Sequence, residues 1–90
     1  MLVLPNELTH AQASACVQLL AQALKAEGRA PVVVDATALT RFDSSALAVL
    51  LEVRREALAL GRTFSVKGLA PRLRELAGLY GVAALLPSAP

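Results

Sequence analysis

The stretch Phe42-Asp43-Ser44-Ser45-Ala46-Leu47 lies between a short run of valines ending in Asp35 and a long apolar segment that extends to residue 60. Three small polar residues in this position are typical of a helix start, because their side-chain oxygens accept hydrogen bonds from backbone N–H groups that have no partner within the helix. The stretch therefore predicts the junction between a strand over residues 31–35 and a helix over residues 45–60.

The helix over residues 45–60 is unusually apolar. Its apolar residues recur three and four positions apart, which predicts one buried stripe. The stripe comprises Ala46, Leu50, Val53, Ala57 and Leu60, and it is widened by Leu47, Leu51 and Leu58. The residues expected on the exposed side are Glu52, Arg55, Glu56 and Arg62.

The N-terminal third predicts one short strand and one helix. Residues 1–4 read as a strand that ends before Pro5, and a helical pattern runs from residue 8 to residue 27. Gly28 follows it, as is typical after the last turn of a helix. The buried face is expected to consist of Ala13, Val17, Leu20, Ala21 and Leu24, with Gln12, Gln18, Gln22 and Lys25 on the exposed side.

The C-terminal third repeats the order of strand and helix. Residues 63–67 alternate as a strand with one buried face does, and Pro71 suits the first turn of a helix over residues 71–79. Arg72 and Arg74 are expected on its solvated face, balanced by Glu75. A last short strand or turn is expected over residues 82–86, followed by a frayed tail over residues 87–90.

Strands that alternate with helices indicate right-handed parallel crossovers and an α/β fold. Because residues 32–34 are all valine, that strand is expected at the centre of the sheet, covered on both faces. Ninety residues suffice for one core. The prediction is a single domain over residues 1–90, with an about four-stranded, mostly parallel (mixed) sheet and three to four helices.

Composition excludes several classes of function. Aromatic residues make up only 3% of the chain, too few for a platform that stacks single-stranded nucleic acid. The net charge is +2 and the arginines are scattered, so there is no basic stripe for DNA. Cys16 is the sole cysteine, which rules out an intrachain disulfide and argues against structural zinc. No apolar run is long enough for a membrane span and no signal peptide is visible, so a soluble cytoplasmic protein is expected.

The sequence offers no catalytic constellation. His10 is the only histidine, and a triad of Ser44, His10 and Asp43 would require two adjacent residues to flank one imidazole. No glycine-rich phosphate loop is present, and no cofactor or metal site is expected. Asp35, at the end of its strand, is expected to cap the following turn. The prediction is a protein that is not an enzyme.

Beyond these patterns, the chain resembles the STAS family, named after sulfate transporters and anti-sigma-factor antagonists. The resemblance is carried by the valine strand ending in Asp35, the motif Asp43-Ser44-Ser45-Ala46-Leu47, and the order of elements after it. The tail Leu76-Ala77-Gly78-Leu79-Tyr80-Gly81-Val82 with Leu86-Pro87 is most similar to the STAS subunit of Mla phospholipid transporters. Two departures are Ala46, where glycine is usual, and a short N-terminus without the usual first hairpin.

The resemblance implies a non-catalytic interaction domain that binds the cytoplasmic ATPase of an Mla-type ABC transporter and works at the inner membrane through that partner. Ser44 matches the functional hydroxyl position of the family. The partner-binding surface is expected on loop 41–45, the start of the following helix and loop 68–72. Its expected residues are Arg41, Asp43, Ser44, Ser45, Leu47, Leu69 and Arg72.

The alternative branch is an anti-sigma-factor antagonist. The resemblance then implies that a serine kinase phosphorylates Ser44 and that the unphosphorylated chain captures this kinase. A helix N-terminus tolerates added phosphate, because its free N–H groups and dipole favour negative charge. The serine pair fits this branch, whereas the compact N-terminus and the Leu79-Tyr80 tail fit the transporter branch.

Overall fold

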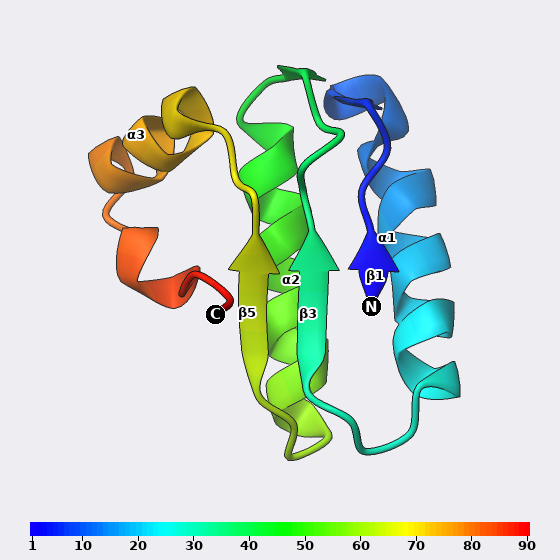
Figure 1. Ribbon diagram of the computed structural model, residues 1–90. Helices are drawn as coiled ribbons and strands as arrows, with labels where there is room; N and C mark the ends of the chain where they lie inside the picture. The colour runs from blue at the N-terminus through cyan, green and yellow to red at the C-terminus, as the bar shows by residue number, and fades with distance from the viewer.

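Three parallel strands form the central sheet of the computed structural model, which describes residues 1–90 (Figure 1). The strands β1 (Leu2–Val3), β3 (Val32–Asp35) and β5 (Phe64–Lys67) lie in the order β1-β3-β5. Val34 pairs with Leu2 on one side and with Val66 on the other. The predicted central position of the valine strand is therefore confirmed.

Two further strands make a separate parallel pair. They are β2 (Glu7–Leu8) and β4 (Arg41–Phe42), and neither was predicted, because two residues are too few to show a strand period. The predicted α/β fold is confirmed, but its parallel strands form two small sheets, whereas one sheet of about four mostly parallel strands was expected. Its two N-terminal strands do not form a hairpin, since each pairs with a strand more than thirty residues later.

Helices α1 (His10–Ala26) and α2 (Ser45–Ala59) pack against each other and lie behind the central sheet in Figure 1. Helix α3 (Pro71–Leu79) and the short 3₁₀ helix η1 (Ala83–Leu85) lie beside β5. No helix covers the front of the sheet. The expectation that β3 is covered on both faces is therefore wrong, and Val33 is only half-buried.

The core lies between the sheet and these helices. Helix α2 buries Ala46, Leu47, Val49, Leu50, Val53 and Ala57. Leu58 and Leu60, which were expected in the buried stripe, are 47% and 52% exposed, although Ala57 beside Leu58 is fully buried. Val49 was missed. The buried residues of α1 are Cys16, Leu20 and Leu24, and Ala13, Val17 and Ala21 are half-buried.

Arg62 is the largest correction to the sequence analysis, since it is 5% exposed and not on the surface. Its guanidinium donates hydrogen bonds to the carbonyl oxygens of Leu24 and Ala30, at 2.6 and 2.7 Å. It also lies 3.4 Å from the Glu27 carboxylate. Carbonyls at the end of a helix lack partners within it, and Arg62 supplies one for α1.

The C-terminal tail is not frayed. Val66 donates its N–H to the Pro87 carbonyl at 2.8 Å and accepts one from Ala89 at 2.9 Å, so the tail lies along the open edge of β5. Arg74, expected to be solvated, is half-buried and donates to the Leu86 carbonyl at 3.2 Å. These bonds fix the segment after α3.

Candidate functional site

Asp43 joins the N-terminal ends of two helices. Its Oδ1 accepts the backbone N–H of Ser45 at 2.8 Å, at the start of α2, and its Oδ2 accepts that of His10 at 3.1 Å, at the start of α1. These two N–H groups, that of Ser45 first, hold the pKa of Asp43 below its ordinary value of 3.8. The carboxylate therefore stays ionised at neutral pH and fixes loop 41–45 to α1.

Ser44 is exposed, and its hydroxyl makes no hydrogen bond. Its backbone is already helical, with φ of −61° and ψ of −17°, so Asp43 and not Ser44 accepts the first free N–H of α2. Of the three small polar residues at the predicted helix start, Asp43 therefore supplies the cap and Ser44 does not. Its hydroxyl is free to meet another molecule.

A groove lies next to this helix start and connects it to α3. Its walls come from β4, the segments before β4 and α3, and the first turn of α3, and its volume is about 350 Å³. The guanidinium of Arg72 lies 5.9 Å from the centre of the Phe42 ring, at a cation–π distance. The lining residues are Leu39, Thr40, Phe42, Ala70, Pro71 and Arg72.

The turns at Gly68 and Thr37 pack tightly against each other. Gly68 adopts a φ of +70°, and a Cβ added to it would lie 2.4 Å from the Thr37 hydroxyl. The turn at Thr37 is capped as predicted, because Asp35 accepts the Thr37 N–H at 2.9 Å. Only glycine combines this backbone with such a close approach.

The structure brings most of the predicted site residues to one end of the molecule. Arg41, Asp43, Ser44 and Arg72 are exposed, and Ser45 is half-buried. Leu69 is half-buried against the core, and Leu47 is only 3% exposed. Leu47 was therefore wrongly placed on the contact surface, because it belongs to the buried stripe of α2. Phe42 lies within the predicted loop 41–45 but was not among the individual residues expected to contact a partner, although rings are rare in this chain.

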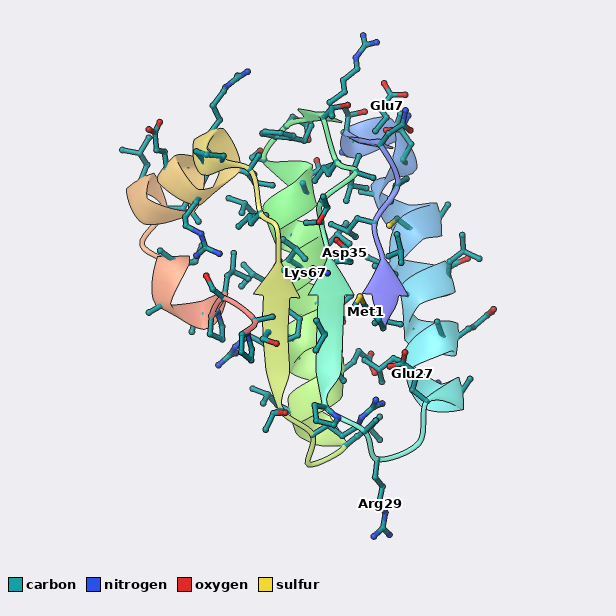
Figure 2. The ribbon with its side chains drawn as sticks, in the orientation of Figure 1. Met1, Glu7, Glu27, Arg29, Asp35 and Lys67 are labelled. Carbon is teal, nitrogen blue, oxygen red and sulfur yellow. The ribbon has the colours of Figure 1, made fainter.

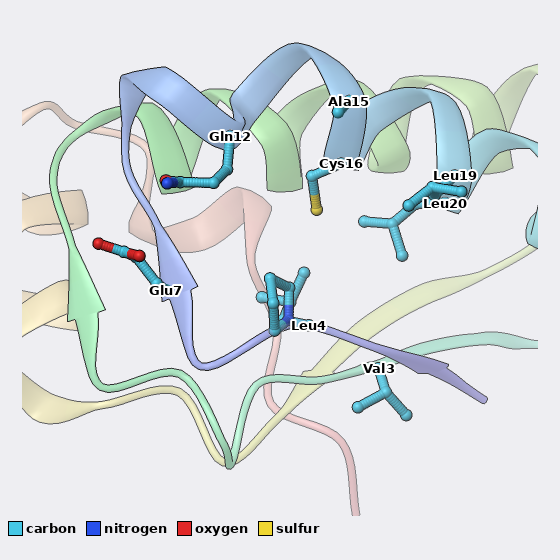
Figure 3. Close-up of a pocket in the computed structure, with 9 residues that line it drawn as sticks. Val3, Leu4, Glu7, Gln12, Ala15, Cys16, Leu19 and Leu20 are labelled. Carbon is cyan, nitrogen blue, oxygen red and sulfur yellow. The ribbon is translucent and has the colours of Figure 1, made fainter.

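A second, apolar groove lies elsewhere, between β1 and α1 (Figure 3). Figure 3 shows Glu7 and Gln12 at one end and Leu19, Leu20 and Val3 at the other. Cys16 lies between them, and burial raises the pKa of its thiol. Gln12, expected to be exposed, is half-buried and accepts the Thr9 N–H at 2.8 Å, which closes the start of α1.

His10 is the single histidine of the chain. His10 is exposed, and its hydrogen bond to Asp43 comes from its backbone N–H and not from its imidazole. No group of three or more His, Cys, Asp or Glu side chains is placed to hold a metal ion. Arg29 and Lys67 are exposed, and Figure 2 shows the Arg29 side chain projecting away from the molecule. None of the helices has the length and apolar character needed to cross a bilayer.

A comparison with known protein families identifies the family of this chain. A family model described as "Mlab, STAS domain" matches residues 1–87. The chain belongs to the STAS family. The match includes the N-terminal strands, whereas the motifs recognised in the sequence lie after Pro31. No curated protein matches the chain. In this STAS domain, the Asp43 carboxylate caps α2, whereas the Ser44 hydroxyl makes no hydrogen bond.

Proposed function

We propose that this STAS domain binds the cytoplasmic ATPase of an Mla-type phospholipid ABC transporter and supports the assembly and activity of that complex in intermembrane lipid transport. The observation that carries the proposal is the free, exposed hydroxyl of Ser44 on a rigid helix start. The description of the matching family supports the choice of transporter. The chain then works in the cytoplasm, peripheral to the inner membrane through its partner.

The chemistry of the surface suits docking. Asp43 fixes the helix start, Ser44 offers a donor and acceptor, and Arg41 and Arg72 place cations on either side. The Arg41 guanidinium is paired with Glu7 at 3.4 Å, but both side chains are exposed, so a partner can replace either one at small cost. The contact is expected to be polar at Ser44 and apolar along the Phe42 groove.

The test is to measure the affinity of the chain for the ABC-type ATPase encoded nearest to it. Wild type should co-purify with the ATPase. Ser44→Glu should remain folded within about 1 kcal/mol, because the helix dipole offsets repulsion by Asp43. The new carboxylate would be desolvated in the complex, so affinity should fall roughly tenfold or more.

Ser44→Ala is the matched control, since it removes the hydroxyl without adding charge, and it should weaken binding less. Glu52→Gln, at a half-buried position in the middle of α2, controls for general charge effects and should bind as wild type does. Unchanged affinity in Ser44→Glu would remove this serine from the interface. Failure of wild type to bind would contradict the proposal itself.

A second candidate is an anti-sigma-factor antagonist, favoured by the same observation, because an exposed serine without a hydrogen bond is accessible to a kinase. The two functions predict different neighbours in the genome: an ATPase and a permease, or a serine kinase and a sigma factor. If such a kinase transfers phosphate from ATP to Ser44, and the transfer is absent in Ser44→Ala, the function as an anti-sigma-factor antagonist is favoured.

A further inference from the structure

Helix α1 presents an uncharged face to solvent. Between Ala11 and Leu24 the helix has no charged side chain, whereas α2 and α3 each carry several. Charged residues are depleted at the centre of protein interfaces, so this face is a candidate contact surface. Its exposed residues, called the α1 face below, are Ala11, Ser14, Ala15, Gln18, Leu19 and Gln22.

The apolar groove between α1 and β1 continues this face toward the sheet (Figure 3). The groove has a volume of about 410 Å³, and β1 is the edge strand of the central sheet. Leu19 on α1 is 68% exposed and Val3 on β1 is 61% exposed, and both line the groove. Covering them would remove apolar surface from water, which favours association.

The two ends of the α1 face carry opposite charges. At the N-terminal end, Asp43 accepts the first N–H group of α1, and Glu7 lies just before the helix. Glu7 also pairs with Arg41 at 3.4 Å, but both side chains are exposed, so this contact is weak. At the C-terminal end, Lys25 and Arg29 are exposed and make no ion pair within the chain. Figure 2 shows Glu7 and Arg29 at opposite ends of the molecule.

A second copy of the chain complements this face when the two α1 helices run antiparallel. If the two-fold axis passes Gln18, residue 14 faces residue 22 of the second copy and residue 11 faces residue 25. Lys25 of each copy then reaches toward Glu7 and Asp43 of the other, so the same attraction occurs twice. Parallel helices would instead bring like charges together.

We infer that the α1 face and the groove beside it form a two-fold interface between two copies of this chain. The molecule measures 31 × 25 × 19 Å, so one of its smaller sides presents roughly 500 Å² to a neighbour. A standard interface buries about 800 Å² on each partner. The dimer is therefore weak and reversible. The inference does not depend on the proposed function.

Sedimentation of the purified chain without any ATPase tests the inference. The average mass should rise from that of one chain toward that of two between about 10 μM and about 1 mM. Leu19→Glu should weaken association roughly tenfold or more, because it places a carboxylate from each copy in the contact. The matched control is Leu79→Glu, at an 84% exposed position of α3 beside the opposite edge of the sheet.

The control should associate as wild type does. A wild-type chain that stays monomeric over the whole range would overturn the inference, and so would an equal loss in both variants. Because no ATPase is present, a chain that binds the ATPase but never self-associates would leave the proposed function standing.

A charge exchange tests the antiparallel arrangement. Lys25→Glu and Glu7→Lys should each weaken the dimer, because each places like charges opposite each other at both ends. The double variant Lys25→Glu/Glu7→Lys should recover part of the loss, since opposite charges again face each other across the axis. Double-variant association weaker than that of either single variant would overturn the inference.

Cross-linking locates the axis. In a chain whose only native cysteine is removed by Cys16→Ala, Gln18→Cys should form a disulfide with itself when oxidised by O₂ and copper phenanthroline. Gln22→Cys is the control, because its two thiols would lie about 12 Å apart along the helices, beyond the reach of a disulfide. Equal or faster cross-linking of Gln22→Cys would contradict the proposed axis and overturn the inference.

Discussion

Asp43 and Ser44 are adjacent in the chain but have different structural roles. The Asp43 carboxylate accepts two backbone N–H groups from two helices, whereas the Ser44 hydroxyl accepts and donates nothing. A short polar side chain at a helix start can cap or remain free, and backbone conformation decides which. Ser44 is already helical, so the capping position falls one residue earlier.

This division predicts opposite effects on stability. Ser44→Ala should change the free energy of unfolding by less than about 0.5 kcal/mol, because no contact is lost. Asp43→Ala should lower it clearly more, since it leaves the Ser45 and His10 N–H groups without their acceptor. Asp43→Asn should fall between, because its amide oxygen can cap α2 while its NH₂ group cannot accept from His10. Urea unfolding of the three variants checks the order.

The same prediction extends to pH. The folded-state pKa of Asp43 lies below its ordinary value of 3.8, so its stabilising effect is present above that value and is lost as pH falls through the folded-state pKa. The stability difference between wild type and Asp43→Asn should therefore shrink as pH is lowered from neutral to below 3.8. A difference that stays constant over this range would show that the ionised carboxylate does not act as described.

At the scale of elements, Arg62 connects the end of α1 to the segment before β3. It is buried, and its guanidinium is hydrogen-bonded to Leu24 and Ala30 and paired with Glu27. Arg62→Met keeps the apolar stem but removes the donor of the Ala30 carbonyl, one of the two donors of the Leu24 carbonyl and one of the two cations paired with Glu27. It should destabilise the chain by about 2–5 kcal/mol. Arg55→Met is the control, since Arg55 is exposed and pairs only with Glu52. Equal losses of stability for the two variants in thermal unfolding would contradict a structural role for Arg62.

At the scale of the whole molecule, the core depends on aliphatic packing because rings are scarce. Leu50 is fully buried on α2, between helix and sheet. Leu50→Ala should cost about 2–5 kcal/mol by leaving a cavity, a large share of the roughly 5–15 kcal/mol total for a small domain. Leu58→Ala, at a 47% exposed position of the same helix, should cost far less. Denaturation midpoints that coincide would contradict the described core.

The sequence by itself determined the α/β class, the central valine strand, the long elements and the helix start at residues 43–45. It could do so because period, turn residues and capping chemistry are local. Only the tertiary structure decided the rest. Strands β2 and β4 exist through pairing with each other, Arg62 is buried because distant carbonyls need donors, and Leu47 faces the core. Asp43 also accepts the His10 N–H at the start of α1, a contact between residues 33 positions apart that no local pattern encodes.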